Sequence, residues 1–133
     1  INQFLNSGLK NLSTQVCTTL NFFNIWNIDE LAYKVKEWNP DFWYINILHH
    51  PVEFDIQQIP REFKQQIIDK LKKTEIYQQE IQTAIDYVNG EPYYKIKDWK
   101  KALTEKIKSI DSVRKENFSE TFKDLNNVLK IYE

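Results

Sequence analysis

Two adjacent histidines, His49 and His50, are followed within a few residues by the carboxylates of Glu53 and Asp55. Imidazole and carboxylate groups are common ligands of transition metals, so this segment is one candidate for a metal site. Adjacent side chains at a strand end point in different directions, however, so both histidines would rarely reach one ion. We therefore expect no metal site here, and we expect His49 to hydrogen-bond to backbone or to a polar ligand.

A second group of polar side chains lies near the ends of two predicted strands. It consists of Asn21, Asn24 and Asn46, together with Thr18 and Thr19. An amide that interrupts an apolar strand, as Asn46 does, must find partners, because leaving it unpaired costs about 1–3 kcal/mol. Either these groups hydrogen-bond across the sheet, or they form a polar pocket for a small ligand at the strand ends.

Cys17, the single cysteine of the chain, lies in the middle of the first predicted strand. We expect it to be a buried and unreactive core thiol, since a reactive cysteine needs access to solvent. A single cysteine excludes an internal disulfide and any zinc site built from cysteines alone.

These side chains depend on a helix–strand–helix–strand segment for their positions. The spacing of apolar residues predicts a helix over 4–12, a strand over 15–21, a helix over 28–38 and a strand over 42–48. Asn27 and Glu30 form a capping-box pattern at the start of the second helix. The second strand is aromatic and β-branched, and Pro51, which has no N–H to donate, stops its ladder. In parallel α/β layers, ligands bind just beyond the carboxyl ends of the strands, where the asparagines and histidines lie.

Helical spacing dominates the rest of the chain. Pro60 is well placed to open a helix, a break is expected near Thr74, and Gly90 marks a C-terminal stop. Asp98 and Ser119 are the expected N-caps of two further helices. The predicted fold class is α/β: a partial parallel βα layer of two strands over residues 1–59, followed by a mostly helical part over 60–133 that packs on it.

Two parallel strands cannot form a stable sheet by themselves, because each leaves an unpaired edge. Both predicted strands are also apolar on both faces, which is typical of a sheet that is covered on both sides. We therefore expect more strands to come from a missing N-terminal portion of the polypeptide or from a partner chain.

The composition is that of an ordinary globular protein, with 41% hydrophobic and 28% charged residues among 133. The net charge of −1 gives no general attraction to nucleic acid or to anionic membranes. Acidic residues lie beside the lysine-rich stretch 70–73 and within the stretch 95–101, so nucleic-acid binding is a minor alternative. No apolar run approaches the roughly 20 residues that span a bilayer, and we expect a cytoplasmic protein with no membrane partner.

Three pairs of segments, spread over most of the chain, resemble the C-terminal region of twitch-domain-containing radical S-adenosylmethionine proteins. They are 18–24 (TTLNFFN) with 28–31 (IDEL), 45–51 (INILHHP) with 56–60 (IQQIP), and 110–114 (IDSVR) with 117–122 (NFSETF). The resemblance implies a partial βα barrel, a partial form of the TIM barrel, with these two strands near its later edge. It also implies that S-adenosylmethionine and a 4Fe–4S cluster lie at the carboxyl ends of the strands of the complete protein.

The same resemblance assigns roles to individual residues. Asn21, Asn24, Asn46 and His49 would line the cofactor or substrate side, where they would hydrogen-bond and position, while the cofactor carries the radical chemistry. Catalytic residues stay unknown. Asp111, Arg114 and Phe118 would instead fix the C-terminal helices to the barrel.

The chain departs from the family pattern in one decisive respect. It lacks the early loop with three clustered cysteines that holds the iron–sulfur cluster, and it also lacks the cysteines of an auxiliary cluster. We therefore expect it to bind neither cofactor alone and to be a protein fragment that needs its N-terminal barrel half, with a small molecule or peptide as substrate. The alternative is a non-catalytic helical interaction module that completes its sheet by oligomerisation, so enzymatic activity is left open.

Overall fold

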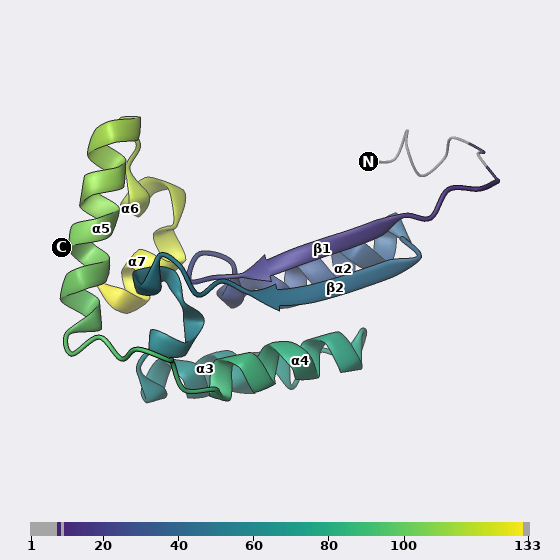
Figure 1. Ribbon diagram of the computed structural model, residues 1–133, viewed down its shortest axis with the longest axis horizontal. Helices are drawn as coiled ribbons and strands as arrows, with labels where there is room; N and C mark the ends of the chain where they lie inside the picture. Colours follow the sequence, from purple (N-terminus) through teal and green to yellow (C-terminus); the bar gives the residue numbers. More distant parts are fainter. Residues whose placement is uncertain (1–7, 9, 132–133) are drawn as a thin grey trace.

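Two parallel strands joined by a helix form the first part of the structure, a computed structural model that describes residues 8 and 10–131 (Figure 1). β1 (Gln15–Leu20) pairs with β2 (Phe42–Ile47), and α2 (Ile28–Trp38) connects them. Both strands and the helix between them were predicted. Most of the helix predicted over 4–12 lies outside the described residues.

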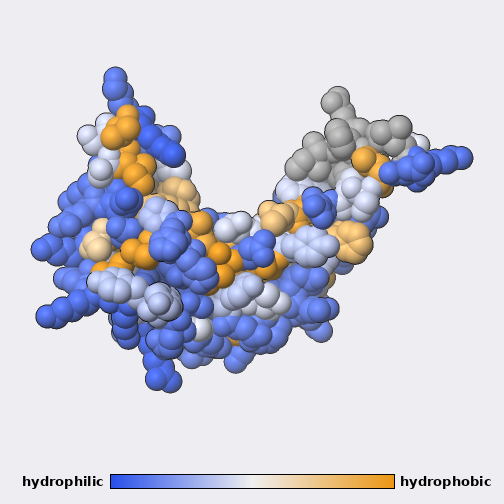
Figure 2. All heavy atoms as spheres, viewed as in Figure 1, coloured by the Kyte–Doolittle hydropathy of each residue, from blue (hydrophilic) through white to orange (hydrophobic). Residues whose placement is uncertain are grey.

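The two faces of this sheet differ in their surroundings. In Figure 1, α2 lies behind the strands and no helix crosses in front of them. Side chains that point toward the helices are buried or half-buried, and the Trp43 indole there donates a 2.9 Å hydrogen bond to the Thr18 hydroxyl. Side chains that point the other way are all exposed, on the side of the sheet that faces the viewer in Figure 2. We call this the bare face, and it consists of Gln15, Cys17, Thr19, Phe42, Tyr44 and Asn46.

The described residues cover only one face of the sheet, although the apolar strands predict cover on both faces. Phe42 and Tyr44 are 53% and 48% exposed, and their rings stack on each other with centroids 6.0 Å apart. Aromatic residues favour strands because they pack well on a pleated, half-buried surface. The apolar character of β2 therefore reflects strand preference as much as burial, at least within the described part of the chain.

A stripe formed by Ile28, Ala32 and Val35 packs α2 against the sheet, because these residues recur at helical spacing and are fully buried. The helix ends at Asn39, whose backbone is left-handed (φ 51°) and whose N–H donates to the Val35 carbonyl at 2.9 Å. Asn27 precedes the helix without a side-chain capping bond, so the predicted capping box does not form.

The helical part begins with α3 (Arg61–Leu71) and α4 (Gln78–Asn89), with Pro60 before the first helix, a break between the two, and Gly90 after the second, as predicted. Three short 3-10 turns precede them: η1 (Ile25–Asn27), η2 (Val52–Phe54) and η3 (Ile56–Gln58). α4 runs alongside β2, where Tyr77 makes an edge-on ring contact with Trp43 at 5.0 Å.

The remaining helices are α5 (Trp99–Arg114), α6 (Phe118–Thr121) and α7 (Lys123–Leu129). Asp98 caps α5 as predicted, accepting from the Lys101 N–H at 3.1 Å. The predicted cap at Ser119 is wrong: Asn117 caps α6 and accepts from the Ser119 N–H at 3.0 Å. Asn117 takes this role because its side chain reaches the N–H two residues ahead.

One hydrophobic core joins the strands to the helices. Leu20 and Ile28 from the strand segment share it with Leu71 and Leu103 from the helices, and all four are fully buried. The structure is thus of mixed α/β type with a two-stranded parallel sheet. None of the helices in the described part of the chain is long and apolar enough to cross a membrane.

Candidate functional site

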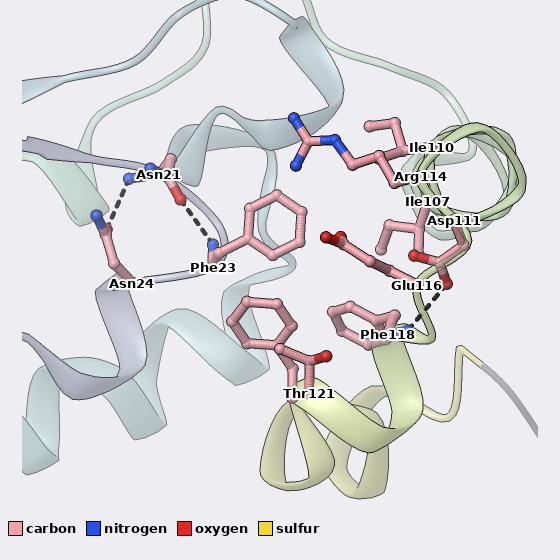
Figure 3. Close-up of a pocket in the computed structure, with 11 residues that line it drawn as sticks. Asn21, Phe23, Asn24, Ile107, Ile110, Asp111, Arg114, Glu116, Phe118 and Thr121 are labelled. Atoms are coloured by element: carbon pink, nitrogen blue, oxygen red, sulfur yellow. Dashed lines mark hydrogen bonds between the residues drawn. The ribbon is translucent and has the colours of Figure 1, made fainter.

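The turn after the carboxyl end of β1 is fixed by the side chains of two predicted site residues. Asn24 accepts the Asn21 N–H at its Oδ1, and Asn21 accepts the Phe23 N–H at its Oδ1, each at 2.9 Å (Figure 3). The Asn24 amide also donates to the Thr19 carbonyl at 2.9 Å. Both amides are therefore engaged with local backbone, as expected of asparagines that stabilise a turn.

This turn aims Phe23 at a cavity of about 410 Å³ between the end of β1 and the helices α5 and α6. The Phe23 ring lies 5.2 Å from Phe122 and 6.2 Å from Phe118, so aromatic rings form one side of the cavity. The cavity is lined by Asn21, Phe23, Asn24, Ile107, Ile110, Asp111, Arg114, Glu116, Phe118, Thr121 and Phe122.

The opposite wall depends on how the chain reverses between α5 and α6. Lys115, in the left-handed region at φ 56°, ends α5. The Asp111 carboxylate then accepts the Phe118 N–H at 2.9 Å, and the Phe118 ring stacks 6.3 Å from Phe22. Asp111 therefore joins α5 to α6, and the Phe118 ring packs α6 against the segment that follows β1.

Charged side chains at the rim of the cavity give it a polar entrance. Arg114 and Glu116 are exposed, and Figure 3 shows the guanidinium and the carboxylate extending toward Phe23. Ion pairs between described residues involve Lys34, His49 and Lys70, and none involves Arg114 or Glu116. An aromatic interior with charged groups at its mouth suits a small molecule that has an apolar body and a charged end.

His49 follows the carboxyl end of β2 and pairs with Asp55 at 2.9 Å through its Nδ1. The Asp55 side chain is buried, and its second oxygen accepts the Gln57 N–H at 2.8 Å, which holds the carboxylate in place. The imidazole is 54% exposed. A neutral ring that donates from Nδ1 presents Nε2 as an acceptor, so His49 can receive a proton or a hydrogen bond from a ligand.

Asn46 and Cys17 lie together on the bare face. The Asn46 amide donates to the Cys17 sulfur at 3.3 Å, and both side chains are exposed. The expectation of a buried core thiol at Cys17 is therefore wrong, because the strand alternation turns this position away from the helices. For the same reason Asn46 does not interrupt a buried surface.

The structure thus brings only two of the four predicted site residues to one cavity. Asn21 and Asn24 line the cavity beside α5, whereas Asn46 lies on the bare face and His49 lies in the following loop. Sequence reasoning did not assign Arg114 and Glu116 to a cavity, because their approach to β1 depends on the chain reversal after α5.

Nothing in the described ranges, 8 and 10–131, arranges three or more His, Cys, Asp or Glu side chains to hold a metal ion. No protein-family model, no curated protein and no solved structure matches this chain.

Proposed function

We propose that this chain is the C-terminal part of a radical S-adenosylmethionine enzyme. It would supply later strands of a partial βα barrel and a helical cap, and it would not be catalytic alone. The observation that carries the proposal is the bare face of the parallel sheet. Parallel sheets are normally covered on both faces, so a parallel pair with one uncovered face is expected to belong to a larger sheet or barrel.

The side chains along the bare face support a barrel interior. From the amino to the carboxyl end, the exposed pairs in register are Gln15 with Phe42, Cys17 with Tyr44, and Thr19 with Asn46. The aromatic groups lie toward the amino ends and the small polar pair lies at the carboxyl ends. Barrels fill their lower interior with side chains and bind ligands at the carboxyl ends of the strands, which is the same order.

The predicted site residues take different parts in this proposal. Asn46 would face the interior of the complete barrel and hydrogen-bond to a cofactor or substrate. Asn21 and Asn24 would hold the loop that frames the cavity beside α5, and His49 would offer its Nε2 at the next strand end. When bound by the complete protein, S-adenosylmethionine and the cluster supply the radical chemistry.

The mass and N-terminal sequence of the native polypeptide test the proposal most directly. We expect a mass well above the 16.1 kDa of this chain, with three clustered cysteines upstream. A native polypeptide of 16.1 kDa would refute it.

Asn46→Ala in the complete protein tests the proposed role of the bare face. We expect the rate of S-adenosylmethionine cleavage to fall about tenfold or more, because hydrogen bonds that orient reactants affect rate strongly. The melting temperature should change little, because Asn46 would face the ligand space at the carboxyl ends of the strands and not the packed lower interior of the barrel. Asn127→Ala, an exposed asparagine in α7, is the matched control. If Asn46→Ala unfolds the protein while activity per folded molecule is normal, its role is structural.

The stacked and exposed rings of Phe42 and Tyr44 favour a second candidate, an interaction module that completes its sheet by self-association. Light scattering of the 133-residue chain distinguishes the two. A dimer that Tyr44→Thr dissociates would support the module, and a monomer at all concentrations would contradict it.

A further inference from the structure

A second cavity, of about 750 Å³, lies on the helical side of the molecule, away from the cavity beside β1. It is enclosed by η3, the start of α3, the segment that leaves α4, and the start of α5. Its lining consists of Gln57, Gln58, Ile59, Pro60, Arg61, Lys64, Gln65, Ile68, Asn89, Glu91, Lys95, Ile96, Lys97, Trp99 and Lys100.

Buried hydrogen bonds hold the walls of this cavity in place. Gln58 is buried, and its side chain accepts the Ile96 N–H at 3.0 Å and donates to the Tyr94 carbonyl, which fixes the 91–97 segment. The Trp99 indole is also buried and donates to the Glu53 carbonyl at 2.9 Å, which fixes the start of α5. A cavity with such anchored walls is largely preformed, as ligand sites usually are.

The charge of the lining is strongly positive, although the chain as a whole is nearly neutral. Five cations face one carboxylate, that of Glu91, so the net charge of the lining is 5 − 1 = +4. No ion pair between described residues involves any of these cations, which are Arg61, Lys64, Lys95, Lys97 and Lys100. Such a concentration of one charge sign in a concave site attracts an anion.

Lys64 is the most unusual of these cations because it is only 9% exposed. Its Nζ donates to the Gly90 carbonyl at 2.9 Å, and none of the described carboxylates forms an ion pair with it. Burial lowers the pKa of Lys64, while the more distant charges of Glu91 and Asp55 oppose that effect. Buried lysines are almost always paired with an opposite charge, so we expect an anion to bind in the cavity near the ammonium group.

Gly90 lets the end of α4 approach η3 closely. A Cβ at this position would collide with the Gln57 side chain, which itself donates to the Tyr87 carbonyl at 3.3 Å. The end of α4 is therefore held close to η3, and its Gly90 carbonyl lies where it can orient the Lys64 ammonium group.

We propose that this cavity binds a phosphate-bearing small molecule of about the size of a nucleotide, with Lys64 and its neighbouring cations as the counter-charges. A cavity of this volume holds a nucleotide-sized ligand, and several cations around one space suit a group that carries more than one negative charge. The apolar side chains of Ile59, Ile68 and Ile96 would contact its uncharged part. This inference is independent of the radical S-adenosylmethionine proposal.

Isothermal titration calorimetry of the 133-residue chain with inorganic pyrophosphate tests the proposal. We expect saturable binding at one site. The double variant Lys95→Gln/Lys97→Gln should weaken binding about tenfold or more, since hydrogen bonds to charged groups contribute most to such affinity. Both residues are exposed, so the fold is expected to persist.

Lys72→Gln/Lys73→Gln is the matched control, because it removes two exposed charges that do not line the cavity. It should change the affinity by less than about twofold if binding is local rather than a response to net charge. Equal weakening by the two double variants would overturn the proposal. Absence of saturable binding, or saturation by a single-stranded oligonucleotide but not by pyrophosphate, would also overturn it.

Discussion

Neighbouring residues of β2 provide the sharpest test of the one-sided burial of the sheet. Ile45 is 8% exposed on the covered face, and Tyr44 is 48% exposed on the bare face. Isoleucine, tyrosine and threonine all favour strands, so replacing either residue by threonine changes strand preference little and burial becomes the main variable.

The two substitutions should differ clearly in cost. Ile45→Thr removes about two buried carbon groups, worth roughly 0.8 kcal/mol each, and places a hydroxyl among apolar neighbours at about 1–3 kcal/mol. We therefore expect a loss of about 3 kcal/mol in the free energy of unfolding. Tyr44→Thr loses mainly the stacked contact with Phe42 and a partly covered ring, for about 1 kcal/mol.

Urea denaturation of the 133-residue chain, followed by circular dichroism, measures both values. Costs for Tyr44→Thr and Ile45→Thr that agree within about 0.5 kcal/mol would refute the assignment of a bare face. In the complete enzyme that we propose, the cost of Tyr44→Thr should instead rise toward that of Ile45→Thr, because the barrel would cover both faces.

Three further predictions concern other parts of the structure. Phe118→Ala should destabilise the chain by about 3–5 kcal/mol in urea denaturation because it empties a buried aromatic cluster, whereas Val113→Ala at an exposed position should cost less than about 0.5 kcal/mol. Asp55→Ala should cost about 1–3 kcal/mol and more than His49→Ala, since Asp55 is buried and serves two donors; equal costs would contradict this. Hydrogen bonds from the Thr14 backbone N–H and hydroxyl lower the pKa of Asp41. The ionised carboxylate therefore stabilises the fold above the unfolded-state pKa of 3.8, and this stabilisation is lost as the pH falls through the lower folded-state pKa. Asp41→Asn should therefore lower the melting temperature near neutral pH and lose that effect in strong acid, and a pH-independent difference would contradict the linkage.

The order of secondary structure could be predicted because local signals agree with one another along most of the chain. Helix α2, for example, shows buried residues at helical spacing and an Asn39-Pro40 stop, and both α3 and α5 begin where Pro60 and Asp98 predict. Where two local signals compete, the prediction failed: Asn117 and Ser119 can each cap a helix, and only the chain reversal after α5 favours the first.

Burial on the sheet was harder to predict, because aromatic residues in a strand can reflect either burial or strand preference alone. The β2 sequence Phe-Trp-Tyr-Ile-Asn-Ile appears continuously apolar, yet it alternates strictly between an exposed and a covered face as far as Asn46. The same alternation exposes Cys17, which had been expected in the core. The exposure of Asn46 fits this alternation, because its amide lies opposite Thr19 on the face that does not meet the helices.

The cavity beside β1 could be only half predicted, because its two walls come from residues almost a hundred positions apart. Local turn chemistry indicated Asn21 and Asn24, and the rule for parallel strands indicated the edge of the sheet. The opposite wall, with Arg114 and Glu116, requires the left-handed Lys115 and the bond from Phe118 to Asp111. No periodicity in the sequence reports such a reversal, so tertiary structure alone brings these charges to the end of β1.

The bare face and the cavity beside β1 also bear on how the two candidate functions differ. Self-association through the bare face would bury Phe42 and Tyr44, and it would cover Thr19 and Asn46 without using their polarity. A barrel would bury the same aromatic pair at its lower end and leave the polar pair beside the ligand space at the carboxyl ends. The barrel that we propose would account for both ends of the bare face. The loops that follow those ends carry Asn21, Asn24 and His49, which would lie at the same edge of the proposed barrel.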